Sequence, residues 1–427
     1  MKVLLVSANT ETINMPVLPL GLGCIARTTQ EAGHDIHVLN LMTQEDPLKI
    51  LKDAIKEFQP EAIGISVRNI DDQVMQQPNF LLEPVKSMIS SCRKHSDAPI
   101  ILGGAGYSIF PQSALNYLAA DMGIQGEGET SFVRLLARLK KKLDLSEIPG
   151  LYLPQKRLPV KVSSTNKLDD LPMPLPGVHL WPFDRLEDGP IWMPFQTRRG
   201  CPLQCSYCST ERFEGRVLRM RDPEVVMQVI SKYAQAGCDH FFFVDNVFNL
   251  PLSYAKALCD KIIAARLNIS WRCILYPWKI DEALIKKMAL AGCKEVSLGF
   301  ESGSTTILQN MNKRFHPEGV RKISQTLKKY RIQQMGFLLF GGPGENKSTV
   351  QESLQYADSL NLDAMKITIG IRIYPHTMLW RQAIKQGVIT PDDNLLNPKF
   401  YFPKDLEIWL PETVDEWIND RPNWFTS

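Results

Sequence analysis

Residues 198–208 read RRGCPLQCSYC, which places Cys201, Cys205 and Cys208 four and three positions apart. Iron–sulfur cubanes are normally held by four cysteine thiolates, so three thiolates would leave one iron open to bind another molecule. Structural zinc sites instead favour a second pair of ligands further along the chain, and no such pair accompanies this stretch. The spacing therefore favours a 4Fe-4S cluster, ligated by these three cysteines, over a zinc ion.

The composition of the 427-residue chain is that of a globular protein with a sizeable core, since 44% of its residues are hydrophobic and 22% are charged. This length predicts about two to three domains. A net charge of +3 is too small to indicate nucleic acid as a partner, and no apolar run reaches the roughly 20 residues of a transmembrane segment. Nine cysteines without a signal peptide indicate a reducing compartment, so we expect a cytoplasmic protein.

The N-terminal third alternates apolar strands with helix-compatible stretches such as 20–32 and 48–58. The expected strands are residues 2–7, 35–40, 62–66, 99–104 and 122–125. Strands that are apolar along their whole length predict a parallel sheet covered on both faces, with ligands bound at the carboxyl ends of the strands. At those ends we expect ligand contacts from Ser7, Asn9, Arg68, Asn69, Gly103, Gly104, Ser108, Gly126, Glu127 and Gly128. Asp71, just beyond, fits either a ligand contact or a capping loop.

A second α/β region begins near residue 191, after a proline-rich stretch. Its candidate strands are residues 191–197, 240–244, 269–276, 295–300, 335–340 and 364–373. The amphipathic helices expected between them include 223–236, 252–265, 282–291 and 317–330. Six strand–helix units are too few for a closed eight-stranded barrel. The three cysteines follow the first strand, at the rim where parallel barrels carry their chemistry.

Three further motifs follow later strands of this region: VDN at 244–246, GFESG at 299–303 and GGPGE at 341–345. Together with the cysteine motif and its aromatic residue, they resemble the radical S-adenosylmethionine (SAM) enzymes, which have an open partial barrel of six units. The resemblance implies that SAM binds the open iron, near Tyr207, Asp245, Arg272, Glu301, Ser302 and Gly341. A turn-starting role for Asp245 and a structural salt bridge for Arg272 are the alternatives.

The N-terminal loops resemble the cobalamin-binding domain of one radical SAM class. The resemblance rests on PLG at 19–21, GG at 103–104 and GEGET at 126–130, and it implies cobalamin as a further cofactor. Cobalamin domains of mutases carry an Asp-x-His-x-x-Gly motif whose histidine ligates cobalt, and neither His34 nor His37 reproduces it. We therefore expect no histidine below the cobalt, and we expect these two histidines at the surface or at a strand edge.

The resemblance implies a Rossmann-like cobalamin-binding domain at 1–145, a linker at 146–190, a radical SAM partial barrel at 191–380 and a C-terminal extension at 381–427. It also implies that a one-electron reductant such as flavodoxin or ferredoxin drives SAM cleavage, and that the resulting radical takes hydrogen from an unactivated carbon of a small-molecule or peptide substrate. Methyl transfer is the commonest outcome in this class. The alternatives are a different reaction (cyclisation, ring contraction or rearrangement) and an N-terminal domain that no longer binds cobalamin.

Residues outside these motifs support plainer expectations. Four further cysteines lack cluster spacing and lie in or beside apolar runs, which predicts buried thiols: Cys238, Cys259, Cys273 and Cys293. His376 follows the last predicted strand, where a surface turn is expected. Three tryptophans of the C-terminal extension fit either a substrate pocket or a tail packed over the barrel: Trp409, Trp417 and Trp424.

Overall fold

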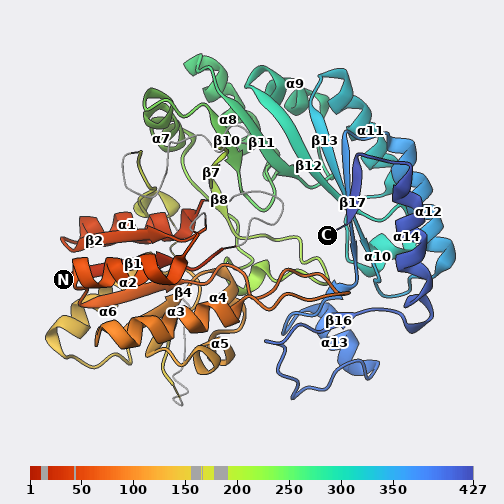
Figure 1. Ribbon diagram of the computed structural model, residues 1–427. Coiled ribbons are helices and arrows are strands. Elements are labelled where there is room, and N and C mark those ends of the chain that lie inside the picture. Colours follow the sequence, from red (N-terminus) through yellow and green to blue (C-terminus); the bar gives the residue numbers. More distant parts are fainter. Residues whose placement is uncertain (11–17, 43–44, 155–164, 166, 177–190, 427) are drawn as a thin grey trace.

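The computed structural model describes residues 1–10, 18–42, 45–154, 165, 167–176 and 191–426. They form two α/β layers that lie side by side (Figure 1). The N-terminal sheet, red to orange, lies beside a larger curved sheet, green to blue. In the described part of the chain, no helix is both long and apolar enough to cross a bilayer.

The N-terminal sheet has the strand order β2-β1-β3-β4-β5-β6. Its strands are β1 (Lys2–Ser7), β2 (Asp35–Asn40), β3 (Ala62–Ser66), β4 (Ile100–Gly103), β5 (Met122–Ile124) and β6 (Leu151–Tyr152). The first five are parallel, as the apolar runs predicted, and β6 pairs antiparallel with β5. The edge position of β2 confirms that His37 is a strand-edge residue.

Helices cover both faces of this sheet. They are α1 (Leu20–Glu31), α2 (Pro47–Phe58), α3 (Leu82–His95), α4 (Ala105–Ile109), α5 (Pro111–Leu118) and α6 (Glu129–Lys141). Alternate residues of β1 enter different cores: Val3 and Leu5 pack with side chains of α1 and α6, whereas Leu4 and Val6 pack with those of α2 and α3. Burial on both faces is the reason that the strands are apolar throughout.

The larger sheet is entirely parallel and has the order β17-β14-β13-β12-β11-β10-β7. Its strands are β7 (Met193–Phe195), β10 (His240–Phe243), β11 (Ser270–Leu275), β12 (Cys293–Glu301), β13 (Gln333–Phe340), β14 (Ala364–Ile369) and β17 (Trp424–Thr426). The six predicted strands are all present. The strand β17 adds a seventh that the sequence did not predict, because three residues in a polar tail show no periodicity.

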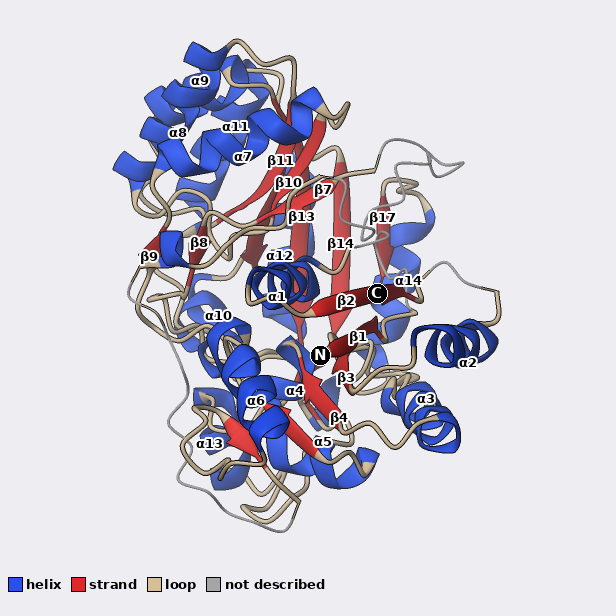
Figure 2. Ribbon diagram, turned by 90° about the vertical axis from the view of Figure 1, so that its left-hand side faces the viewer, coloured by secondary structure: helices blue, strands red, loops and turns tan. Residues whose placement is uncertain are grey.

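One face of the larger sheet is covered by helices α7 (Pro223–Gln235), α8 (Leu252–Ala265), α9 (Glu282–Leu290), α10 (Thr305–Asn310), α11 (Pro317–Lys329) and α12 (Lys347–Leu360). Figure 2 shows α7, α8, α9 and α11 packed along the outside of these strands. Trp271, Cys273 and Leu275 of β11 are buried against this layer, while Arg272 points to the other face and stacks on the Trp192 and Phe242 rings. The sheet is therefore a partial barrel with β7 and β17 as its edges.

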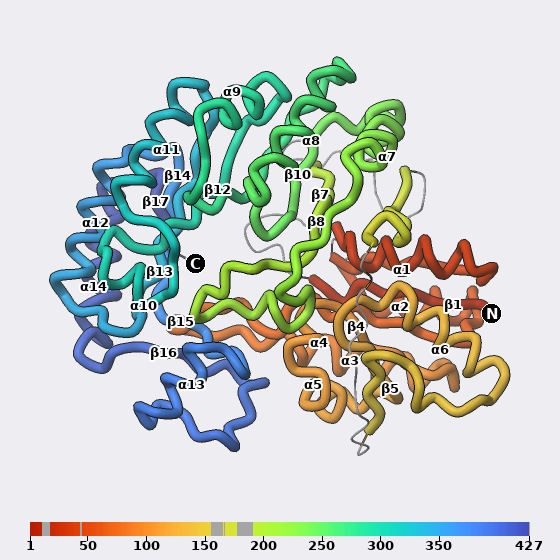
Figure 3. Tube along the Cα trace, turned by 180° about the vertical axis from the view of Figure 1, so that it is seen from behind, coloured from red at the N-terminus to blue at the C-terminus, as the bar shows by residue number. Residues whose placement is uncertain are grey.

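A short ribbon frames the cysteine loop. It consists of β8 (Arg198–Arg199) and β9 (Arg219–Met220), with the short helix η2 (Thr210–Arg212) between them. Figure 3 shows this yellow-green part of the chain running between the red-orange sheet and the larger sheet. The cysteine loop therefore lies where the two layers meet.

The chain after β14 packs partly on each layer. Elements β15 (Ile371–Arg372), α13 (Met378–Lys385) and β16 (Phe400–Tyr401) share a buried core with Leu4 and Val6 of β1. Helix α14 (Trp409–Asn419), preceded by η3 (Lys404–Leu406), packs on the larger sheet together with β17, and Trp424 is buried there. Of the two roles considered for the C-terminal tryptophans, packing over the barrel is the one that the structure supports.

The predicted linker is described only in part, since residues 155–164, 166 and 177–190 lie outside the described residues. The described part contains β6 and the short helix η1 (Leu168–Asp170). Carbonyl oxygens of Leu168 and Leu171 accept hydrogen bonds from Arg221, which fastens this segment beside β9. The division of the chain at residues 145, 190 and 380 stays a prediction.

Candidate active site between the two sheets

A cavity of about 450 Å³ opens where the strands of the N-terminal sheet end. Parallel sheets bind ligands at these carboxyl ends, so the cavity lies where the sequence predicted one. The predicted contact residues that line it are Ser7, Asn9, Arg68, Gly103, Gly104, Ser108, Gly126, Glu127 and Gly128. Asn69 instead lines a smaller neighbouring hollow. Of the predicted contact residues, Asn69 is the one that does not line the cavity.

The opposite wall of the cavity comes from the larger sheet and the cysteine loop. Three of its residues are Gln196, which follows β7, Arg199, which stands two positions before Cys201, and Asn246, which follows β10. Glu214, between the cysteines and β9, lines it as well. Asn246 belongs to the predicted VDN motif, whereas Gln196, Arg199 and Glu214 were missed because they reach the cavity only through the docking of two segments far apart in the sequence. The charged pair directly before the cysteines was the available signal.

The cavity residues fit a bulky ligand with many polar groups. At Gly21 a Cβ atom would meet nothing within 4 Å, and at Gly103 it would meet only the Ile124 carbonyl at 4.0 Å, so both glycines leave room that a side chain would fill. Gly104 has φ +102°, and its Cβ would lie 2.5 Å from the Val67 carbonyl oxygen. Among the described residues that line this cavity there is no histidine.

The three motif cysteines occupy the loop between β8 and η2. Gly200 opens the loop with φ +89°, where a Cβ would lie 2.1 Å from the Val217 carbonyl oxygen. The Cys208 N–H donates to the Cys205 carbonyl at 3.2 Å and closes a turn. Burial, together with repulsion from the other two thiols, raises the pKa of Cys201 to about 11. The loop thus gathers three soft donors that lose their protons on binding iron.

This donor set fits a cubane rather than a single ion. In the described ranges, no three Cys, His, Asp or Glu side chains converge closely enough to hold one metal ion. A cubane does not require such convergence, because each thiolate binds a different iron. The four cysteines predicted to be buried lie elsewhere: Cys259, Cys273 and Cys293 are buried and Cys238 is half-buried, as expected for small apolar side chains.

Two predicted SAM residues, Tyr207 and Glu301, meet beside the cysteine loop. Lys313 joins them, with its Nζ 2.9 Å from the Tyr207 hydroxyl and 3.1 Å from Glu301 Oε1. Burial alone would lower the pKa of Lys313, but the Glu301 and Tyr207 oxygens raise it well above its usual range. Glu301 has φ +63° and lies at a register shift of β12, a strained geometry that is common at functional sites.

Asp245, one of the residues predicted to lie near SAM, is held by hydrogen bonds from the protein. It is fully buried, and Oδ1 accepts from the backbone N–H groups of Thr197 and Arg198 at 2.7 and 2.9 Å. Oδ2 accepts from the Thr197 hydroxyl at 2.6 Å and from the Arg198 guanidinium at 2.8 Å. Protein donors occupy both oxygens, so Asp245 braces the strand that leads into the cysteine loop.

Arg272 is another of the residues predicted to lie near SAM. It lies in register with Glu295, six positions before Glu301 on β12, and this corresponds to roughly 20 Å along a strand. The guanidinium stacks between the rings of Trp192 and Phe242, at 4.5 and 4.9 Å. Arg272 therefore lies toward the end of the barrel away from Glu301.

The other two predicted SAM residues support the rim of the barrel. The Ser302 hydroxyl is buried against that of Ser353 at 2.8 Å and packs β12 on α12. Gly341 has φ +95°, and its Cβ would lie 2.6 Å from the Phe402 side chain. The backbone N–H groups of Gly341 and Gly342 donate to the Glu345 carboxylate. These contacts shape the turn after β13.

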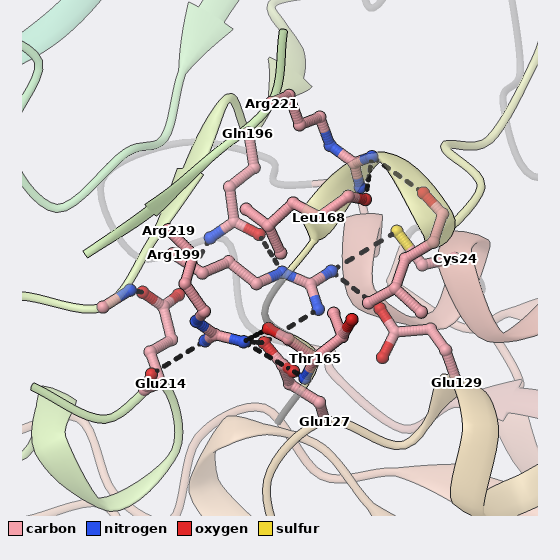
Figure 4. Close-up of polar contacts among 12 residues, drawn as sticks. Cys24, Glu127, Glu129, Thr165, Leu168, Gln196, Arg199, Glu214, Arg219 and Arg221 are labelled. Atoms are coloured by element: carbon pink, nitrogen blue, oxygen red, sulfur yellow. Dashed lines mark hydrogen bonds and ion pairs between the residues drawn. The ribbon is translucent and has the colours of Figure 1, made fainter. Parts of the chain in front are cut away.

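A network of ion pairs joins the two walls of the cavity (Figure 4). Arg199 lies 2.7 Å from Glu129 and 3.4 Å from Glu127, and Arg219 lies 2.7 Å from Glu127. Each of these side chains is at most 9% exposed. Burial and the nearby Glu129 raise the pKa of Cys24, on the same wall, to about 11. The GEGET loop of the N-terminal sheet is thus clamped to the ribbon that carries the cysteines.

Two family models match the two layers. Residues 6–136 match the B12 binding domain, and residues 196–357 match the Radical SAM superfamily. The chain belongs to the cobalamin-dependent radical SAM enzymes. The cofactors of this family are a 4Fe-4S cluster, SAM and cobalamin, as the cysteine motif and the N-terminal loops predicted.

Similarity to known proteins extends over most of the length of this chain. An "Uncharacterized methyltransferase" of Pyrococcus horikoshii is 27% identical to this chain, and the aligned region covers 91% of this chain and 84% of the relative. The "Cytidylyl-2-hydroxyethylphosphonate methyltransferase" of Streptomyces wedmorensis is 24% identical, and the aligned region covers 88% of this chain and 80% of the relative. The radical SAM methyltransferase TsrM of Kitasatospora setae, solved with cobalamin and a [4Fe-4S] cluster, shares the fold with a TM-score of 0.86, 21% identity and coverage of 99% and 92%. The chain is therefore a methyltransferase-like member of its family.

Proposed function

We propose that this protein is a cytoplasmic C-methyltransferase that uses SAM, a 4Fe-4S cluster and cobalamin to methylate an unactivated carbon of a small-molecule or peptide substrate. The observation that carries the proposal is the cavity whose one wall is the GEGET loop and whose other wall is the ribbon of the cysteine loop. Methyl transfer needs the two cofactors next to each other, and the three similar proteins described above are named as methyltransferases.

When bound, the cofactors supply electron transfer, SAM cleavage and a carrier for the methyl group. The protein holds and shields them. Cys201, Cys205 and Cys208 would ligate the cluster, and the N-terminal loops that line the cavity would hold cobalamin. Glu301, fixed in place by Lys313, is the acceptor best placed to receive hydrogen bonds from the amino or ribose groups of SAM.

The reductant is proposed to be a small one-electron carrier such as flavodoxin or ferredoxin. Cys208 supports this part of the proposal, because it is exposed while Cys201 and Cys205 are only half-buried. One edge of a cluster held here would lie near the surface. An electron carrier docked over Cys208 would then have a short path to the cluster.

The test is anaerobic reconstitution of the protein with iron, sulfide and hydroxocobalamin, followed by addition of SAM and a reductant. We expect a cobalamin spectrum that survives desalting, together with release of 5′-deoxyadenosine and S-adenosylhomocysteine. Cys205→Ala should abolish the cluster absorbance and both products, whereas Cys238→Ala, which changes a cysteine outside the motif, should retain them. Loss of cobalamin on desalting, or no SAM cleavage by protein with a full cluster, would contradict the proposal.

A further inference from the structure

A chain of hydrogen bonds begins at the GEGET loop and crosses the cavity wall. Arg199 Nη2 donates to Glu129 Oε1 at 2.7 Å, and Arg199 Nε donates to Gln196 Oε1 at 3.0 Å (Figure 4). Gln196 Nε2 then donates to Glu214 Oε1 at 2.8 Å. Each side chain uses a different atom for each neighbour, so the chain is continuous from the N-terminal sheet to the cysteine loop.

The same chain ends at a sulfur atom of the cluster motif. Glu214 Oε2 accepts from Asn246 Nδ2 and from the Gly200 N–H at 2.9 Å. Asn246 Oδ1 lies 3.4 Å from the Thr210 hydroxyl, which lies 3.2 Å from Cys208 Sγ. An unbroken path of polar contacts therefore links Glu129, beside the proposed cobalamin, to Cys208, a proposed ligand of the cluster.

The two ends of the path face different surroundings. The cavity is lined by its first five members: Glu129, Arg199, Gln196, Glu214 and Asn246. Thr210 and Cys208 are not among the cavity-lining residues. Whatever fills the cavity therefore touches one part of the path, and whatever binds Cys208 touches the other.

The Thr210 hydroxyl makes the path sensitive to the state of the sulfur. A thiol at Cys208 can donate to the Thr210 oxygen, which leaves the hydroxyl hydrogen for Asn246 Oδ1. A cluster-bound thiolate can only accept, so the single hydroxyl hydrogen must turn to the sulfur. Binding of a cluster would thus break the link between Thr210 and Asn246, because Asn246 Oδ1 has no hydrogen to donate, and this change at Asn246 is passed on to its hydrogen bond with Glu214 on the cavity wall.

We propose that this path couples the two cofactor sites, so that a bound cluster raises the affinity for cobalamin and bound cobalamin raises the affinity for the cluster. Thr210 and Gln196 are its positioning residues. Each cofactor orders the same wall of side chains, so the second one to bind meets a wall that is already ordered. The coupling is reciprocal by thermodynamic necessity. The inference rests on the proposed function, because it requires that both cofactors bind.

The experiment titrates hydroxocobalamin, followed by its visible absorbance, into cluster-loaded and cluster-free protein under anaerobic conditions. We expect cluster-loaded protein to bind hydroxocobalamin about tenfold more tightly than cluster-free protein does, and this ratio of affinities is within the usual range of coupling between sites. Thr210→Val should bring this ratio close to one, because the state of the Cys208 sulfur can then no longer reach Asn246 on the cavity wall. The same variant should lower the reduction potential of the cluster, since a hydrogen bond to its sulfur is lost.

Two further variants make the result specific. Thr210→Ser keeps the hydroxyl and should keep the tenfold ratio of affinities. Gln196→Leu interrupts the middle of the path and should bring that ratio close to one. Arg216→Gln is the matched control, because it breaks an exposed ion pair with Glu211 on the same loop and leaves the path intact. Equal cobalamin affinities of cluster-loaded and cluster-free wild type, or an undiminished ratio in Thr210→Val, would overturn this inference and leave the proposed function standing. Protein that binds no cobalamin in either state would overturn the proposed function with it.

Discussion

Asp71 Oδ2 accepts a hydrogen bond of 2.9 Å from Arg372 Nε, 301 positions further along the chain, and neither side chain is more than 2% exposed. Arg372 also donates to the carbonyl oxygens of Ile373 and Leu395, at 2.9 and 2.7 Å. The pair joins the loop after β3 to the segment after β14. Asp71 therefore fastens the two layers together, and of the two roles considered for it the structural one holds.

We predict that Arg372→Met lowers the free energy of unfolding by about 3–5 kcal/mol, because it leaves the buried Asp71 carboxylate without a partner. Urea denaturation followed by circular dichroism measures this. The control is Arg421→Met, which breaks the pair with Asp358 that is partly exposed to solvent; that change should cost no more than about 1 kcal/mol. A similar small cost for Arg372→Met would mean that the layers are held by apolar packing alone.

The double variant Asp71→Leu/Arg372→Met separates the pair from its surroundings. If the cost of Arg372→Met comes from an unpaired buried charge, removing both charges should recover part of the stability, since apolar residues can replace a buried ion pair. The measured costs of the two single changes should then add to more than the cost of the double change. Strict additivity would contradict a direct interaction.

We predict that Gly104→Ala destabilises the protein by about 1–3 kcal/mol, since φ +102° is a conformation that an alanine rarely adopts. The new Cβ would lie 2.5 Å from the Val67 carbonyl oxygen and would displace the loop beside the cavity. Cobalamin affinity should fall with stability, which equilibrium titration measures. Gly319→Ala is the matched control: Gly319 lies in α11, where a Cβ meets nothing within 4 Å, so stability should rise slightly. Equal effects of the two changes would contradict the strain argument.

Sequence patterns located the scaffold better than the chemistry of individual side chains. Helix α8 has the predicted bounds, Leu252–Ala265, because one apolar stripe marks its whole length. The contact between Arg199 and Glu129 could not be predicted, because it joins positions 70 residues apart through the docking of two layers. The hydrogen bonds of Asp245 could not be predicted for a related reason: a rim carboxylate looks alike in sequence whether protein donors saturate it or leave it open to a ligand.

We predict that Lys313→Met lowers the reduction potential of the cluster, because it removes a positive charge that lies next to Tyr207 and Glu301. SAM should bind about tenfold more weakly, the effect of roughly one lost hydrogen bond, since Glu301 would no longer be held in place. Lys313→Arg keeps the charge and should retain most of the potential. Electron paramagnetic resonance during a redox titration measures the potential, and an unchanged value in Lys313→Met would contradict the prediction.

The last prediction concerns Glu345, which is 4% exposed and whose pKa burial raises to about 7. Its pKa in the folded protein is above that in the unfolded chain, so between about pH 4.5 and pH 7 the folded state binds more protons. The free energy of unfolding should therefore decrease as the pH rises through this window, by up to about 3 kcal/mol from this group. Glu345→Gln cannot ionise, while its side-chain oxygen can still accept from Gly341 and Gly342. The difference in stability between pH 5 and pH 8, measured by urea denaturation, should be smaller in Glu345→Gln than in the wild type. An equal difference in both proteins would show that Glu345 titrates at its ordinary pKa.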